Sequence, residues 1–121
     1  RVGMWQGYHG VDIIATVDME KETEIHRLAG SFLQDQNSWI FMPEKVEFFV
    51  SNDGKKFKSV GIVRNTVPQD VDYPVLQELE VVKDIKARYV RMVASTIGVC
   101  PDWHVGAGDK AWTFCDEFII E

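Results

Sequence analysis

Residues 46–63 read VEFFVSNDGKKFKSVGIV, and this stretch decides the fold class. Apolar and polar side chains largely alternate over residues 46–50, which is the period of a strand with one buried face. Residues 51–55 contain the pair Asp-Gly, which favours a hairpin turn because it tolerates positive φ angles. A second apolar stretch returns over residues 57–63. The segment therefore predicts an antiparallel β-hairpin.

The same period of two continues on both sides of this hairpin. Five further candidate strands lie at residues 13–19, 25–33, 75–82, 88–95 and 113–120. With seven strands and no sustained helical period, the sequence predicts an all-β protein. An antiparallel β-sandwich is the natural way to bury one face of two sheets. The expected core residues are Val17, Leu28, Phe48, Val50, Val90 and Met92.

The connections between the candidate strands differ in length. If every strand crosses the sandwich once, one end holds the short charged connections at residues 20–23, 52–55 and 83–86. The other end then holds the long connections at residues 1–11, 34–44, 64–74 and 96–112. All four tryptophans lie in or beside these long segments. Because long loops in compact domains are usually functional or disordered, and large rings favour burial or contact, we expect a binding surface there.

Composition limits the classes of partner. The chain has 121 residues and a formal net charge of -6. This length suits one domain with one core, and an acidic surface repels nucleic acid and anionic lipid. No apolar run approaches the length that spans a bilayer, so we expect no membrane insertion. The chain begins at Arg1 without a signal-like segment, which we interpret as a single module, residues 1–121, excised from a longer protein.

Several segments occur in an order and spacing typical of one family. They are WQGYHG at residues 5–10, FLQD at 32–35, SWIFMP at 38–43, VEFFVSNDG at 46–54, RYVR at 88–91, PDWH at 101–104 and AWTFCDE at 111–117. Together they resemble the discoidin family, also called coagulation factor 5/8 type C domains. The stretches at residues 39–41 and 103–104 are most similar to the carbohydrate-binding modules appended to bacterial β-hexosaminidases (chitobiases). The resemblance implies a jelly-roll-like sandwich of the galactose-binding-domain type, with ligand loops at one end.

The function that this resemblance implies is non-catalytic carbohydrate binding within a secreted glycosidase. The partners would be a terminal galactose- or N-acetylhexosamine-type sugar and the catalytic domain of the same polypeptide. The location would be extracellular, periplasmic or on the cell surface. The alternative is a structural or protein-interaction domain without a sugar site, since discoidin folds also bind proteins and lipids.

A structural calcium ion is the one cofactor that the resemblance raises. Family members usually begin with another strand and a loop containing Asp-Gly, and that loop helps to build a calcium site. This chain starts after that point, so we expect it to lack the N-terminal strand and to bind calcium weakly or not at all. Glu117 lies where the family often supplies a ligand.

The candidate sugar site combines aromatic rings with polar side chains from the long loops. Its residues are Gln34, Asp35, Trp39, Trp103 and His104, with Trp5 and Tyr8 as second choices. One of the two loop tryptophans, Trp39 or Trp103, would stack on the C–H face of a sugar. The polar members would form hydrogen bonds with its hydroxyls or acetamido group. The simpler interpretation is that some of these rings close the open end of the sandwich and that His9 and His104 are structural.

The sequence offers little support for catalysis. Asp116 and Glu117 are adjacent in a candidate strand and point to opposite faces, so they cannot act as a paired acid and base. Glycoside hydrolysis needs two carboxylates roughly 5–9 Å apart, a spacing that no motif indicates here. We interpret the loop residues Asp35 and Asp102 as acceptors for sugar hydroxyls.

The two cysteines leave alternatives open. Cys100, His104 and Cys115 suggest a zinc site, but a fourth ligand and a C-x-x-C pair are missing. Cys100 and Cys115 lie near the same end of the sandwich. They could form a disulfide, or they could remain two buried thiols.

Overall fold

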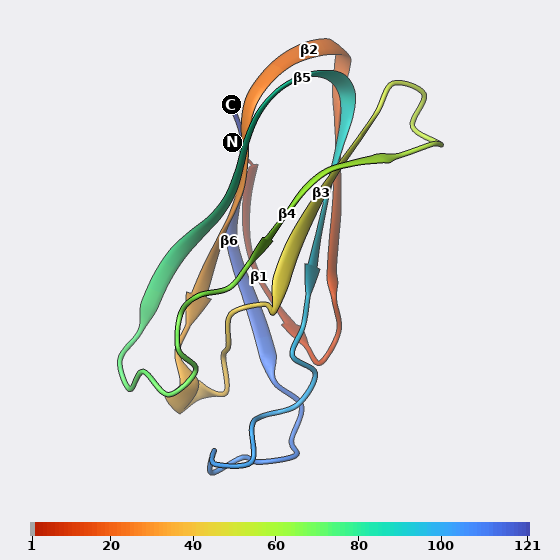
Figure 1. Cartoon of the computed structure of the whole chain (residues 1–121). Coiled ribbons are helices and arrows are strands. Elements are labelled where there is room, and N and C mark those ends of the chain that lie inside the picture. Colours follow the sequence, from red (N-terminus) through yellow and green to blue (C-terminus); the bar gives the residue numbers. More distant parts are fainter. Residues whose placement is uncertain (1) are drawn as a thin grey trace.

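The computed structural model describes residues 2–121, apart from the side chains of Val2, Met4 and Trp5. Its strands are β1 (Val2–His9), β2 (Ile13–Gln34), β3 (Lys45–Ser51), β4 (Lys58–Arg64), β5 (Val75–Ser95) and β6 (Trp112–Ile120). One turn of 3-10 helix, η1 (Gln36–Ser38), follows β2. The strands pair antiparallel in the order β1-β6-β2-β5-β3-β4 (Figure 1), which confirms the all-β class. No helix in this described part is long and apolar enough to cross a membrane.

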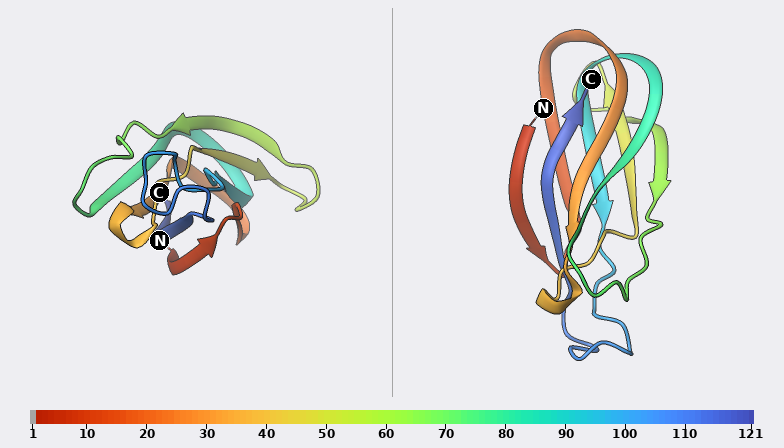
Figure 2. Two further views of the ribbon diagram at one scale, coloured as in Figure 1. Left: turned by 90° about the horizontal axis from the view of Figure 1, so that it is seen from below. Right: turned by 90° about the vertical axis from the view of Figure 1, so that its left-hand side faces the viewer.

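The strands β2 and β5 are long enough to belong to both layers of a sandwich. They contain 22 and 21 residues and pair with each other along nearly their whole length. Both arch over one end of the molecule, so the single sheet curls into two facing layers (Figures 1 and 2). One layer holds β4, β3 and residues 88–95 and 13–18 of the long strands. The other layer holds the remaining halves of β5 and β2, followed by β6 and β1.

The expectation of seven strands in two separate sheets is corrected by this arrangement. The candidate strands on either side of residues 20–23 join as β2, and those on either side of residues 83–86 join as β5. Neither segment contains the glycine or proline that would interrupt a strand, and a shift in register between Asp18 and Thr23 absorbs the bend. β1 is an additional strand, formed by residues that we expected to be a loop.

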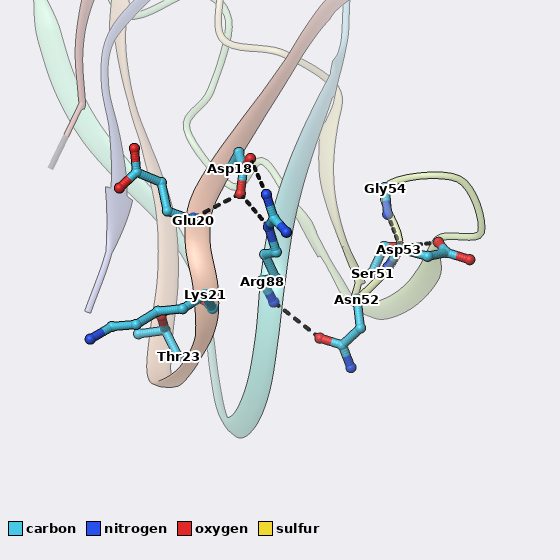
Figure 3. Close-up of polar contacts among 9 residues, drawn as sticks. All are labelled: Asp18, Glu20, Lys21, Thr23, Ser51, Asn52, Asp53, Gly54 and Arg88. Atoms are coloured by element: carbon cyan, nitrogen blue, oxygen red, sulfur yellow. Dashed lines mark hydrogen bonds and ion pairs between the residues drawn. The ribbon is translucent and has the colours of Figure 1, made fainter.

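An ion pair joins the two long strands next to their bends, and a hydrogen bond joins the same place to the hairpin turn (Figure 3). Nε and Nη2 of Arg88 donate to the two carboxylate oxygens of Asp18, at 2.9 and 3.0 Å. The backbone N–H of Arg88 donates to Oδ1 of Asn52 at 3.1 Å. Asp18 also accepts the N–H of Glu20 at 2.7 Å, next to a φ angle of 71° at Glu20. All three short connections therefore lie at one end of the sandwich, as expected.

The hairpin between β3 and β4 forms where the sequence predicts it. Oγ of Ser51 accepts the N–H groups of Asp53 and Gly54 at 3.2 and 3.0 Å, and Oδ1 of Asp53 accepts two further N–H groups of the turn. Gly54 has a φ angle of 74°, and a Cβ atom there would lie 3.0 Å from the ring of Tyr89. This position therefore favours glycine for two independent reasons.

The Asp18–Arg88 pair makes stability depend on acid pH. The side-chain hydrogen bonds from Arg88 hold the pKa of Asp18 below its usual value of 3.8. A carboxylate with a lowered pKa in the folded state stabilises the protein above its unfolded pKa, and that contribution is lost as the pH falls through the folded pKa. We expect Asp18→Asn to lower the thermal midpoint at neutral pH, with the difference from the parent shrinking below about pH 4.

The matched control for this experiment is Asp72→Asn, at an exposed carboxylate in a loop at the other end. This variant should unfold at the parent midpoint at every pH. If the midpoint of Asp18→Asn stayed equally far below the parent in acid, the loss would come from packing and not from the ionised pair.

The main core lies between the two layers. Phe48 in β3 and Phe118 in β6 approach from opposite layers, with ring centroids 6.1 Å apart. Four of the expected core residues are fully buried, namely Leu28, Phe48, Val90 and Met92. The other two, Val17 and Val50, are half-buried and pack against the same cluster. The expected core is thus confirmed at its centre and reaches the surface at its margins.

Candidate functional site

The long connections gather at the end opposite the bends (Figures 1 and 2). Backbone hydrogen bonds join them. The N–H of Trp112 donates to the carbonyl of Trp39 at 2.8 Å, and the N–H of Phe41 donates to the carbonyl of Trp112 at 2.9 Å. The N–H of Gly10 donates to the carbonyl of Ala111 at 2.8 Å. The loops therefore hold one another in place, and their common end is the one that the sequence predicts.

Trp39 closes this end of the sandwich. It is half-buried and packs against a small apolar cluster, separate from the main core, made of Phe41, Cys100 and Ala111. Gly106 lies so close that a Cβ atom there would be 1.8 Å from Nε1 of Trp39. The ring is therefore held by its own neighbours, as the simpler interpretation of the loop aromatics expects.

His104 connects the loop between β5 and β6 to the loop between β2 and β3. Its side chain is buried, and its Nδ1 accepts the N–H of Gly106 at 2.9 Å. The ring hydrogen is therefore on Nε2, which donates to the carbonyl of Gln36 at 2.6 Å. The ring also makes edge contacts with Trp39 and Trp103, with centroids 5.0 and 5.7 Å apart. Both ring nitrogens are used inside the protein, so His104 orients the tryptophans.

Gln34 holds two further loop segments in place through hydrogen bonds of its side chain. Its side chain is fully buried, Nε2 donates to the carbonyl of Pro68 at 2.8 Å, and Oε1 accepts the N–H of Met42 at 3.3 Å. Gln34 therefore positions the loop at residues 64–74. Asp35 accepts the hydroxyl of Ser38 at 3.2 Å and stabilises the turn η1. These polar candidates hold the loops together.

The exposed part of the candidate site is a hollow that we call the Trp103 hollow, lined by Gln69, Asp70 and Trp103. Its volume is about 450 Å³, and the side chain of Trp103 is 51% exposed. Gln69 and Asp70 follow directly after Pro68, the residue whose carbonyl Gln34 holds. Sequence reasoning missed both residues, because their long loop was recognised but its polar members could not be ranked.

A second hollow, of about 290 Å³, lies on the outer face of β1 and β6. It is lined by Gly7, Ser38, Ile40, Trp112 and Phe114. The ring of His9 stacks on the ring of Trp112, with the two centroids 4.4 Å apart, and covers part of the Trp112 ring.

The two remaining candidates lie on β1. The hydroxyl of Tyr8 donates to Oε1 of Gln6 at 2.5 Å, and its ring packs against the main core. The side chain of Trp5 lies outside the described residues. Tyr8 is not among the described residues that line the Trp103 hollow.

The acidic residues of β6 bear on the metal sites considered from the sequence. Asp116 is buried and accepts the hydroxyl of Ser31 at 3.5 Å. Across the described residues, no three His, Cys, Asp or Glu side chains, Glu117 included, are grouped so that they could share a metal ion. Cys100, His104 and Cys115 are therefore not grouped as the ligands of a zinc ion, and a calcium-binding role for Glu117 stays a prediction.

Both cysteines are buried, and neither forms a disulfide. Cys115 belongs to the main core and Cys100 to the small loop cluster. Burial raises the pKa of Cys115 to about 12 and also raises the pKa of Cys100. Of the two arrangements that the sequence left open, a disulfide or two buried thiols, the structure shows two buried thiols.

We expect neither thiol to react with a disulfide reagent in the folded protein, because burial removes both access and the reactive thiolate. Both should react after denaturation without a reductant, measured by release of the coloured leaving group. Thr66→Cys, which places a thiol at an exposed position, is the positive control and should label quickly in the folded state. A denatured parent that stayed unreactive until reduced would contain a disulfide.

The curled antiparallel sheet, with its long loops at one end, defines a discoidin-like β-sandwich. Comparison of the sequence with models of known families indicates the same class of domain. Residues 3–118 match the F5/8 type C domain, and the chain belongs to that family. This confirms the resemblance read from the sequence. A search of curated proteins found no significant match.

The chain is similar to several solved structures at low sequence identity. The C-terminal domain of a chitobiase from Bacteroides fragilis is 22% identical over 92% of this chain and 66% of its own, with a TM-score of 0.45. A Clostridium perfringens carbohydrate-binding module, solved with GalNAc-β-1,3-galactose, is 19% identical over 86% and 65%, with a TM-score of 0.47. A pectin-binding module is 13% identical over 95% and 69%, with a TM-score of 0.50. The chain spans about two thirds of each of these domains.

Proposed function

We propose that the protein is a non-catalytic carbohydrate-binding module whose site is the Trp103 hollow. The observation that carries this proposal is the half-exposed ring of Trp103 beside an amide and a carboxylate, Gln69 and Asp70. An aromatic face stacks on the C–H face of a pyranose, and the two polar groups can accept and donate hydrogen bonds to its hydroxyls. Few contacts in an open hollow favour weak binding.

The supporting residues prepare this site before a sugar arrives. Gln34 holds the loop that contains Gln69, and His104 contacts the ring of Trp103 from a position locked by two hydrogen bonds. A site whose loops are already ordered loses less conformational freedom on binding, which increases affinity. The predicted residues Gln34 and His104 therefore serve the site by positioning it.

The absence of catalysis in this proposal rests on the composition of the hollow. Asp70 is the one carboxylate among the described residues that line it. Hydrolysis of a glycosidic bond generally uses two carboxyl groups on either side of the bond. A single exposed carboxylate suits a hydrogen-bond acceptor for hydroxyls.

We propose a terminal galactose- or N-acetylhexosamine-type sugar as the ligand, following the resemblance of residues 39–41 and 103–104 to modules of bacterial β-hexosaminidases. The module would be part of a secreted or surface glycosidase. It would keep the catalytic domain of the same polypeptide near its substrate by raising the effective concentration.

We expect Trp103→Ala to weaken binding of the tightest sugar by about 1–3 kcal/mol, by analogy with ring stacking on other planar ligands. Isothermal titration with a panel of galactose, N-acetylgalactosamine and N-acetylglucosamine measures this. Trp112→Ala is the matched control, because it removes a partly exposed tryptophan from the other hollow and should leave the affinity unchanged. Equal binding by folded Trp103→Ala would place the site elsewhere. If no sugar in the panel binds, the structural or protein-interaction alternative is favoured.

A further inference from the structure

A third hollow, of about 440 Å³, lies at the opposite end from the Trp103 hollow, among the bends and the hairpin turn. Four of the eight lysines of the chain line it, namely Lys56, Lys58, Lys83 and Lys86. They come from the start of β4 and its preceding turn, and from the bend of β5. We call this feature the lysine hollow. Its volume falls in the range of small-molecule sites, which is roughly 300–1,000 Å³.

Most of the positive charge in the lysine hollow is not neutralised by the protein. Nζ of Lys86 lies 3.6 Å from Glu22, but Lys56, Lys58 and Lys83 form no ion pair with any described carboxylate. Two acidic side chains at this end of the molecule already have other partners. Asp84, which also lines the hollow, lies 2.6 Å from Nδ1 of His26, and Asp53 accepts backbone N–H groups of its own turn. A local basic site therefore exists in a chain with a net charge of -6.

The floor of the lysine hollow is apolar. Lys58 is directly opposite Val50 in the β3–β4 ladder, and directly opposed residues share one face of a sheet. Val50, Val60 and Ile85 line the hollow and pack against the main core. Ammonium groups around an apolar floor match a ligand that has both anionic groups and C–H surface.

Edge protection accounts for only part of this arrangement. β4 is an edge strand, and lysines on edge strands discourage pairing with other chains. That explains Lys58, but it gives no reason for lysines of a second segment, at the bend of β5, to surround the same hollow.

We propose that the lysine hollow binds the carboxylate or sulfate groups of an acidic polysaccharide. The lysines would contact the anionic groups, and the floor of Val60 and Ile85 would contact the C–H face of a sugar ring. A single flexible glycan chain can approach the hollow alone, whereas a membrane or a nucleic acid duplex would also face the acidic remainder of the surface. This second surface lies at the opposite end from the Trp103 hollow and does not require it.

The test is affinity electrophoresis of the full chain through gels containing polygalacturonate, chondroitin sulfate or uncharged dextran. The parent should be retarded by one of the acidic polymers and not by dextran, and added salt should abolish the retardation. Lys58→Gln with Lys83→Gln should weaken the interaction by about fivefold to tenfold, from two exposed charge contacts. The control pair Lys21→Gln with Lys110→Gln changes the net charge equally but lies outside the hollow, and should bind like the parent.

Three results would overturn this proposal. These are no retardation by either acidic polymer, equal loss of binding by the control pair, and tighter lysine-dependent binding to vesicles containing anionic lipid. The last result would assign the hollow to a membrane. Trp103→Ala separates the two sites, because it should reduce binding of neutral sugar and leave retardation by the acidic polymer unchanged. Failure of one site therefore does not imply failure of the other.

Discussion

Replacing Phe48 with alanine should lower the free energy of unfolding by about 3–5 kcal/mol, the usual cost of removing a large buried ring and leaving a cavity. Phe48 is fully buried, and its ring packs between the layers, 6.1 Å from that of Phe118. Because the two layers are one curled sheet, the cavity would form where the halves of the molecule are pressed together. Chemical denaturation followed by fluorescence measures the loss.

Phe49→Ala is the matched control for this variant. Phe49 is the next residue in β3, faces the other side of the sheet and is partly exposed. Its removal should cost clearly less, because less apolar surface returns to water. A loss below about 1 kcal/mol for Phe48→Ala, or equal losses for the two variants, would contradict the assigned core.

Gly106→Ala should be the second most damaging change, at about 3 kcal/mol, because overpacking forces neighbours to move. A Cβ atom at this position would lie 1.8 Å from Nε1 of Trp39, far inside any real contact. The loop also donates its Gly106 N–H to His104, so a shift would release the ring that orients Trp103. We therefore expect lower thermal stability together with weaker sugar binding.

Gly3→Ala is the control for the glycine substitution, because a Cβ atom at Gly3 would have no heavy atom within 4 Å. It should change neither the midpoint nor the affinity by a measurable amount. If Gly106→Ala kept the parent stability and the parent affinity, the packing of Trp39 against this loop would not support the site.

Local patterns predicted the central part of the fold well. The hairpin at residues 46–63, the buried Phe48 and the grouping of short and long connections all follow from alternation, turn residues and connection length. These features depend on neighbours that are close in the chain. A resemblance in the order of several motifs added the family, which the match over residues 3–118 confirms.

The bends and the first strand depended on contacts that are distant in the chain. Residues 20–23 belong to β2, and the adjacent Asp18 accepts a hydrogen bond from Arg88, which lies 70 positions further along the chain. Residues 2–9 contain glycines and no clear alternation, and they become a strand by pairing with β6. A short stretch of sequence around Asp18 does not include Arg88, and a short stretch around β1 does not include β6.

In the candidate site, too, the position along the chain could be predicted from local sequence, whereas the direction of the side chains depends on distant contacts. The sequence placed Trp103 and His104 in a long loop at the end where the long loops gather, but the direction of each side chain depends on its partners. Gln34 turns inward because Pro68 and Met42 offer a carbonyl and an N–H there. Gln69 became a candidate only once the structure placed it beside Trp103.

The most direct test of the proposed site is a titration of ¹⁵N-labelled protein with the tightest neutral sugar of the panel, followed by amide and indole chemical shifts. We expect the largest changes at the indole N–H of Trp103 and the amides of Gln69 and Asp70, with little change at Arg88 in the opposite end. Shifts centred on Trp112 or on the bends, or no shifts with any sugar, would contradict the assignment of the Trp103 hollow as a carbohydrate site.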